Sequence, residues 1–321
     1  MSLKNKKLVA ILGGRKYLNN LTLRKFLTPD IRNKLKKDNI DFIIATNNKS
    51  AAKEYKQIEN LKVVETSKKL HNSFKNRQRE AFTNLGAETR ETINKYSIKN
   101  KYTYTLHLDD NINNISVSLY NSTLKKKFAT KRTIKKYQPQ SFYEIIKLLF
   151  FVIEKSNSGC VGITMSQYPS SNNPRITAGF PYSFFVHKID KNFEFENSTE
   201  DDIIMSIYNG NKGKPSCVIR DCIMYGKTGK SKSKDGNRLI YNKMLQNNQR
   251  GEYAEKTYPE IYTRKISYMQ KSSTSQKKIV LQHKHRLHKP KNWDQQLRVD
   301  KIVFQEINKV VTNIYNRENN V

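Results

Sequence analysis

The sequence predicts an α/β fold in which helices flank a mostly parallel central sheet, with basic loop insertions and a helix at the C-terminal end. Three observations predict it. Short apolar runs typical of buried strands alternate with segments of helical periodicity through the first third of the chain. Strands separated by helices form parallel sheets with right-handed crossovers. The chain also has 321 residues, of which 36% are hydrophobic, enough for one large domain or two smaller ones.

The first third contains four predicted strands, with predicted helices between the first and second strands and between the third and fourth. The first strand runs into Gly13-Gly14-Arg15, which reads as a turn. The fourth strand ends at a pair of aspartates, and ligands of parallel sheets bind beyond the carboxyl ends of strands. The predicted strands are Lys7–Leu12, Asp41–Thr46, Leu61–Glu65 and Tyr102–Leu108, and the predicted helices are Leu23–Lys37 and Ser73–Lys95.

The elements after residue 140 continue this pattern less regularly. Ser198 or Thr199 is expected to cap a helix that runs through Ile203 and Tyr208. The final segment, Trp293–Ile314, is amphipathic and is expected to pack back on the body of the protein. The other predicted elements are a helix over Phe142–Glu154 and strands over Val161–Ser166, Tyr182–His187 and Cys217–Tyr225.

The charge of the chain points to a polyanionic partner. There are 60 Lys and Arg against 28 Asp and Glu, which gives a formal net charge of +32. Nucleic acid is the expected partner, with an acidic membrane surface or solubility without a specific partner as the alternatives. Basic stretches at 125–136, 227–250 and 264–291 have the composition of phosphate-contacting loops. The candidate contacts to nucleic acid are Lys126, Lys131, Arg132, Lys135, Lys230 and Lys232.

Cysteine usage and hydropathy indicate a cytoplasmic protein without a membrane anchor. The three cysteines are an odd number and fit no metal-binding spacing. The start of the chain lacks the long apolar core and cleavage site of a signal peptide. The longest apolar stretch, Ile145–Ile153, is too short to span a bilayer.

The strongest local feature is the segment LHLDDNI, residues 106–112. A buried strand that ends in Asp109, Asp110 and Asn111 presents several oxygen ligands at one point. Hard divalent cations such as Mg²⁺ and Mn²⁺ prefer such ligands. The alternative is a polar turn that ends a strand, which Asp and Asn favour in any protein.

Three other segments are candidates for chemistry. In Ser198–Asp202, a carboxylate could remove a proton from an attacking hydroxyl, although acids at a helix N-terminus are also favoured by the helix dipole alone. In His283–His288, one histidine could complete a metal shell, the alternative being a solvated basic strand or tail. The segment Gly226–Ser231 resembles a phosphate-binding loop, but Met224 occupies the position of the required first glycine.

The order of these motifs resembles the GT-A glycosyltransferases associated with TET/JBP-type base hydroxylases, which occur in phages and are related to the base J glucosyltransferases. The resemblance covers residues 7–225. It lies in the first strand with its Gly-Gly-Arg turn, in Asn76-Arg77-Gln78, in Leu108–Ile112 and in Thr199–Ile203. It implies a GT-A-like, Rossmann-related nucleotide-sugar and catalytic domain over 1–225, with a basic insertion at about 113–140. Residues 226–321 would then add basic acceptor-binding loops and a helical extension packed on the same domain.

The resemblance also implies an activity and roles for individual residues. The activity is transfer of a sugar from a UDP-sugar to a hydroxymethylated pyrimidine base in DNA, with Mn²⁺ or Mg²⁺ as cofactor. Asp201, with Glu200 next, would be the catalytic base. Asp109 would contact the nucleoside, and Gly13, Arg15 and Arg77 the diphosphate. Asp110 and Asn111 would face the metal, with His288 as a further ligand, although Asn111 stands where the usual Asp-X-Asp pattern has its last aspartate.

Three alternative functions share the same features. A metal-dependent nuclease would also combine paired acids with a basic surface. A non-catalytic nucleic-acid-binding protein would need the basic surface alone. A GT-A enzyme that modifies protein or lipid would need the acids but not the basic loops.

Overall fold

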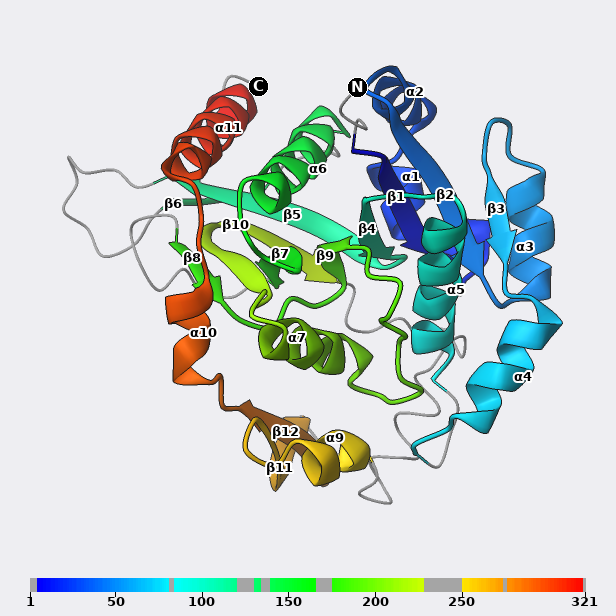
Figure 1. The fold of residues 1–321 in the computed structure, drawn as a ribbon, viewed down its shortest axis with the longest axis vertical. Helices are drawn as coiled ribbons and strands as arrows, with labels where there is room; N and C mark the ends of the chain where they lie inside the picture. The colour runs from blue at the N-terminus through cyan, green and yellow to red at the C-terminus, as the bar shows by residue number, and fades with distance from the viewer. Residues whose placement is uncertain are drawn as a thin grey trace.

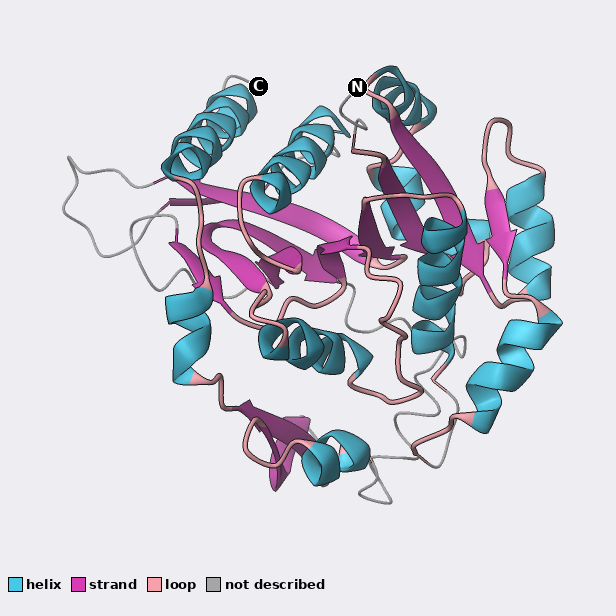
Figure 2. Cartoon of the chain, in the orientation of Figure 1, coloured by secondary structure: helices cyan, strands magenta, loops and turns pink. Residues whose placement is uncertain are grey.

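A computed structural model describes residues 5–80, 84–119, 130–133, 139–165, 175–227, 250–273 and 276–319. Within these residues the chain forms a mixed α/β fold around a ten-stranded sheet (Figures 1 and 2). Helices cover both faces of that sheet, which confirms the predicted fold class. A separate two-stranded ribbon lies apart from the sheet.

The first part of the sheet is parallel, as predicted. Its strands are β1 (Lys7–Leu12), β2 (Ile40–Thr46), β3 (Val63–Glu65) and β4 (Tyr104–Asp109), in the spatial order β3-β2-β1-β4. The chain moves outward from β1 to β3 and then returns to the other side of β1. The connecting elements are η1 (Tyr17–Asn19), α1 (Leu21–Lys25), α2 (Pro29–Lys37), α3 (Lys49–Lys56), α4 (Lys68–Asn76) and α5 (Leu85–Lys99).

The second part of the sheet is mixed. Strand β9 (Phe184–Lys188) lies antiparallel between β4 and β7 (Cys160–Met165). Beyond β7, β10 (Cys217–Lys227) pairs in parallel with it. The remaining strands are β5 (Ile112–Leu119), β6 (Thr130–Thr133) and β8 (Arg175–Ala178). Seven of the ten strands run in one direction, and β5, β8 and β9 run in the opposite direction, so the sheet is mostly parallel.

The two faces of the sheet have separate cores because side chains of successive strand residues point to opposite faces. On one face, Val9 and Ile11 join a large cluster with α1, α2 and α6 (Pro139–Glu154). On the other face, Leu8 and Ala10 pack with Ile93 of α5. Further along that face, β9 packs against α7 (Asp201–Asn211).

The C-terminal segment returns to the body of the protein. After α9 (Glu252–Thr257), the chain forms the ribbon of β11 (Tyr262–Ser273) and β12 (Gln276–Leu287), followed by α10 (Lys291–Gln296) and α11 (Lys301–Asn319). The apolar face of α11 joins the same core as α6 through Val303, Ile307, Val311 and Ile314. Their spacing is that of one helix face.

Three predicted helices are each divided in two. The predicted helix Leu23–Lys37 is divided between α1 and α2. The second of these begins at Pro29, because proline fits the first turn of a helix and not its interior. The predicted helix Ser73–Lys95 is divided because a new helix, α5, begins inside it. Asn84 is the N-cap residue of α5, and its Oδ1 accepts from the N–H groups of Gly86 and Ala87. The prediction Trp293–Ile314 is divided between α10 and α11.

The basic segment 264–291 was predicted as phosphate-contacting loops, and most of it is the β11–β12 ribbon instead. In the part of the chain that the structure describes, no helix combines the length and apolar character needed to cross a membrane.

Candidate active site

The carboxyl ends of β1 and β4 bring the first predicted residues together. Leu12 and Asp109 are register partners at these ends. The Gly13 N–H donates to the Ala45 carbonyl at 2.7 Å, and a Cβ on Gly13 would stand 2.4 Å from Ile44 Cγ2, so the turn passes tightly over β2. The strand order reverses at this point, which is where α/β sheets bind their ligands.

Arg15, two residues after Gly13, bridges the two strand ends. Its Nη1 donates to Asp110 Oδ1 at 2.6 Å, and its backbone N–H donates to Asp110 Oδ2 at 3.2 Å. The turn that follows β4 is fixed by Thr22, whose hydroxyl donates to the Asp109 carbonyl at 2.5 Å and accepts from the Ile112 N–H at 3.0 Å. The expected cluster of Gly13, Arg15, Asp109 and Asp110 therefore exists.

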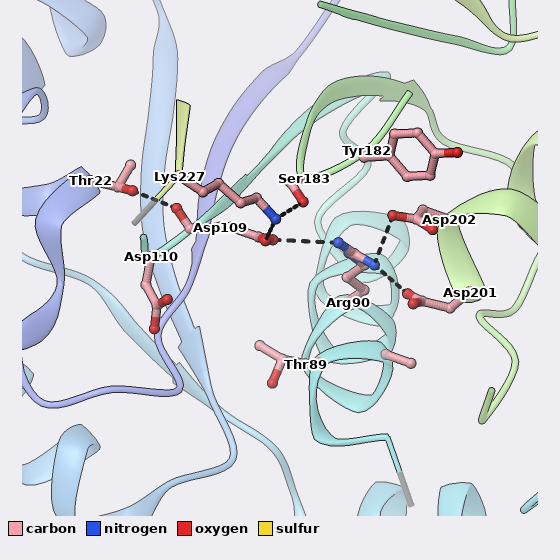
Figure 3. A network of polar contacts seen from close by, with 12 residues as sticks. Thr22, Thr89, Arg90, Asp109, Asp110, Tyr182, Ser183, Asp201, Asp202 and Lys227 are labelled. Carbon is pink, nitrogen blue, oxygen red and sulfur yellow. Dashed lines mark hydrogen bonds and ion pairs between the residues drawn. The ribbon is translucent and has the colours of Figure 1, made fainter. Parts of the chain in front are cut away.

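A buried arginine joins the two acidic segments. Arg90 of α5 contacts Asp201 Oδ2 at 2.6 Å through Nη1 and Asp109 Oδ1 at 3.4 Å through Nη2 (Figure 3). Its Nη1 also lies 3.8 Å from Asp202 Oδ2. The acids near positions 109 and 201 thus converge on one cation, and that cation is a guanidinium.

Sequence reasoning missed Arg90 because it lies inside a segment interpreted as an ordinary amphipathic helix. The sequence of α5 does contain a signal, because polar residues occur on all sides of this helix. In the structure several of these polar residues are buried. They include Glu88, Thr89, Glu91 and Asn94. A helix that buries polar groups needs polar partners for them.

A second overlooked cation is Lys227, at the end of β10. Its ammonium donates to Asp109 Oδ2 at 2.5 Å and also to the Ser183 hydroxyl. Ser183 adopts the left-handed conformation, with φ of 55°, and its carbonyl accepts from the Asp109 N–H at 2.9 Å. Non-glycine residues in this conformation are uncommon and often occur at functional sites.

The second acidic motif lies at the start of α7. The expected cap by Ser198 or Thr199 is wrong: Glu200 is the N-cap residue, and no side-chain cap bond forms there. Ser198 and Thr199 are instead held by Glu80, which accepts from the Thr199 N–H at 2.9 Å. Asp201 and Asp202 occupy the first turn, where the helix dipole stabilises negative charge.

The carboxyl groups differ in their titration. For Asp109, burial opposes ionisation, but Lys227 and Arg90 outweigh it and hold its pKa below the usual value. Burial raises the pKa of Asp110 to about 7 and that of Glu200 to about 7. Burial also raises the pKa of Asp201 and of Asp202, against the attraction of Arg90.

Glu200 faces a different partner from the two aspartates. Arg250 Nε donates to Glu200 Oε1 at 3.2 Å, and the Gly251 N–H donates to Thr199 Oγ1 at 3.0 Å. These contacts fix the segment before α9, and with it the base of the β11–β12 ribbon, beside the acids of α7. The charge of Glu200 also contributes to the raised pKa of Tyr262, whose largest cause is burial.

Other predicted site residues lie elsewhere. Arg77 ends α4 and pairs with Glu194 at 2.5 Å, so it does not belong to the group around Arg90. His288 follows β12, where its N–H donates to the Ile261 carbonyl and its ring approaches Thr263 Oγ1 at 3.4 Å. Lys131 and Arg132 lie on β6, opposite Ser118 and Val117. Lys126, Lys135, Lys230 and Lys232 lie outside the described residues.

The donor set does not suit the expected divalent cation. Among the described residues, no three His, Cys, Asp or Glu side chains form a group that could hold a metal ion. The carboxyl groups of Asp109 and Asp110 point in different directions, one toward Arg90 and the other away from it (Figure 3). The oxygens of both carboxylates already accept from Arg90, Lys227 or Arg15.

Comparison with known proteins gives little. No protein-family model matches the chain, and no curated protein matches it. A solved structure with some similarity is that of mannose-1-phosphate geranyltransferase from Thermus thermophilus, at 11% sequence identity and a TM-score of 0.27. The match covers 70% of this chain and 58% of the other, so the chain matches little more than half of that protein. The fold class therefore rests on the topology of the chain itself.

Proposed function

We propose that this protein transfers a sugar from a nucleotide-sugar donor to a hydroxylated pyrimidine base in DNA, and that it belongs with the TET/JBP-associated GT-A glycosyltransferases. The observation that carries the proposal is the convergence on Arg90 of Asp109, at a strand end beside the switch point of the sheet, and of Asp201 and Asp202. Such a site offers a place for a nucleotide and a carboxylate base within one hydrogen-bonded network.

The donor is proposed to bind across the ends of β1 and β4. Asp109 would hold the nucleoside and Arg15 the diphosphate. The side chain of Arg15 is 20% exposed, so it can be reached by a ligand, and a guanidinium suits phosphate oxygens.

In the proposed reaction, the acceptor hydroxyl oxygen forms a bond to the anomeric carbon of the sugar. The bond from that carbon to the diphosphate oxygen breaks, and the nucleoside diphosphate leaves with the electron pair. The hydroxyl proton passes to a carboxylate. General-base assistance of this kind contributes about 10²- to 10⁴-fold in rate.

Accessibility and pairing support Asp202 as the base in preference to Asp201, the residue expected from the sequence. The Asp201 side chain is 4% exposed and is bound to Arg90 at 2.6 Å. The Asp202 side chain is 13% exposed and lies 3.8 Å from the same guanidinium. We therefore assign Asp201 to positioning Arg90 and Asp202 to accepting the proton.

The β11–β12 ribbon supports DNA as the acceptor. Its register places Lys265 opposite Lys284 and Lys271 opposite Lys278. Lysines recur along both strands, and a polyanion would favour such a concentration of positive charge. A two-stranded ribbon fits the major groove of DNA. A target base would then be flipped out toward α7, since it is inaccessible inside the duplex.

Release of UDP tests the proposal. The protein is incubated with a panel of UDP-sugars and a duplex that contains hydroxymethylcytosine. We expect acceptor-dependent release of UDP, reduced about 10²-fold or more in Asp202→Asn. The matched control is Asp190→Asn, which removes a carboxylate paired with Lys212 at the surface and should keep the activity. Cleavage of the DNA without release of UDP would favour the nuclease and contradict the proposal.

A further inference from the structure

We propose that the two cationic side chains Lys227 and Arg15 neutralise the donor diphosphate in this site, and that a divalent metal ion is not needed for the donor to bind. This inference rests on the proposed function. It departs from what the resemblance implies, and the reason is the chemistry of the donor set.

The first argument is that all four oxygens of the two strand-end carboxylates already accept from a cationic side chain or from a backbone N–H. Asp109 Oδ1 contacts Arg90 and its Oδ2 accepts from Lys227 at 2.5 Å. Asp110 Oδ1 accepts from the Arg15 guanidinium at 2.6 Å, and its Oδ2 accepts from the Arg15 N–H. A hard divalent cation requires several oxygen ligands at about 2.0–2.6 Å, so it would have to displace two buried or half-buried cations.

The second argument is that charge in the site is already compensated. The Asp109 carboxylate lies between two cations, with its Oδ2 2.5 Å from the Lys227 ammonium and its Oδ1 3.4 Å from the Arg90 guanidinium. The Asp110 carboxylate lies 2.6 Å from the Arg15 guanidinium. A site whose acids are balanced by built-in cations does not gain from adding two further positive charges before the donor arrives.

The third argument is that both cations keep donors for a phosphate. A lysine ammonium has three N–H groups, and the described contacts of Lys227 use two, on Asp109 and Ser183. A guanidinium has five N–H groups, and among the described residues the Arg15 side chain donates only through Nη1, to Asp110. Lys227 contacts Asp109, the last residue of β4, and Arg15 contacts the following Asp110, so both cations lie at the strand end where we place the diphosphate.

The consequence concerns the leaving group. When the bond to the sugar breaks, the departing diphosphate gains negative charge, and fixed cations beside it stabilise that charge. Lys227 is already held in place by Asp109 and Ser183. The protein thus has a preorganised cation at Asp109, next to Asp110, which the resemblance assigns to the metal ion.

Binding of UDP, measured by isothermal titration calorimetry in excess EDTA and again with Mn²⁺, tests the inference. The full chain is compared with Lys227→Met and with Lys212→Met, which removes a lysine from an exposed ion pair with Asp190. We expect the same affinity with and without the metal. Lys227→Met should weaken binding about tenfold or more, because hydrogen bonds to charged groups contribute strongly, while Lys212→Met should bind UDP normally.

The outcomes separate the two proposals. Binding that appears only with Mn²⁺ overturns the inference and leaves the proposed function standing. A Lys227→Met variant that binds UDP as tightly as the unaltered protein also overturns it. Absence of UDP binding under both conditions overturns the proposed function, and the inference with it.

Discussion

Arg90 should be essential for the stability of the fold near neutral pH. Its side chain is 8% exposed and lies within ion-pair distance of Asp109, Asp201 and Asp202. Replacing it with methionine leaves three carboxylates without their shared cation. Removal of one partner from a buried ion pair costs about 3–5 kcal/mol, and solvent screens little here because the Asp201 side chain is only 4% exposed. Urea unfolding of Arg90→Met should show a loss of that size.

The loss should depend on pH in a defined direction. An acid whose folded pKa lies above its unfolded value favours folding at low pH, and this contribution disappears as the pH rises through the folded pKa. Burial already raises the pKa of Asp201 and Asp202, against the pull of Arg90. Without Arg90 these pKa values rise further, so the deficit should be largest above about pH 7 and should shrink toward about pH 5.

The control for this experiment is Arg317→Met. Arg317 donates to both carboxylate oxygens of Glu144 at 2.9 and 2.8 Å, but its side chain is 33% exposed. A pair of this kind contributes about 1 kcal/mol or less. If Arg90→Met lost no more than Arg317→Met, or lost the same amount at both ends of the pH range, Arg90 would not be the electrostatic centre of the site.

Three further predictions concern the core, the nucleotide turn and the ribbon. Burial lowers the pKa of His187 from 6.5 to about 4, so the stability that this histidine contributes is present above pH 6.5 and is lost as the pH falls to about 4. In His187→Phe, the loss of stability between pH 6.5 and pH 4 should be smaller by up to about 3 kcal/mol, measured by urea unfolding of both proteins at the two pH values. Gly13→Ala should lose about 1–3 kcal/mol in urea unfolding because its Cβ would lie 2.4 Å from a buried isoleucine methyl, whereas Gly14→Ala, whose nearest neighbour is 4.0 Å away, should be close to neutral. Replacing the opposed pair Lys271 and Lys278 with glutamate should reduce the salt dependence of DNA binding in fluorescence anisotropy, with a slope lower by about 1.8 if each lysine neutralises one phosphate; an unchanged slope would remove the ribbon from the DNA interface.

The parallel part of the fold could be predicted from sequence because its signals are local. The first strand was predicted over Lys7–Leu12 and forms there, and the strands at β2, β3 and β4 were placed within two residues of their ends. Buried parallel strands are continuous apolar runs, and these are easily recognised. The antiparallel insertion of β9 between β4 and β7 depends on pairing across the whole chain, and no local pattern specifies it.

The candidate site could be predicted only in part. Acids at Asp109, Asp110 and Asp201 were recognisable because carboxylates at element ends are rare in a basic chain. Their cations were not recognisable, because Arg90 and Lys227 are two among 60 Lys and Arg residues. Which of these lies beside a carboxylate is decided by tertiary packing. The expected metal ligand His288 failed for the same reason, since its contacts are with Ile261 and Thr263.

Mass spectrometry of the acceptor base tests the central claim most directly. Duplex DNA containing hydroxymethylcytosine is incubated with the protein and each of several UDP-sugars, then digested to nucleosides. The account predicts that, with at least one donor, the modified nucleoside gains the mass of one sugar residue, and that Asp202→Asn lowers the rate of this gain about 10²-fold or more. The account would be contradicted if the hydroxymethylcytosine gained no mass with any donor. This result counts only if the protein is shown to be folded and to bind the DNA.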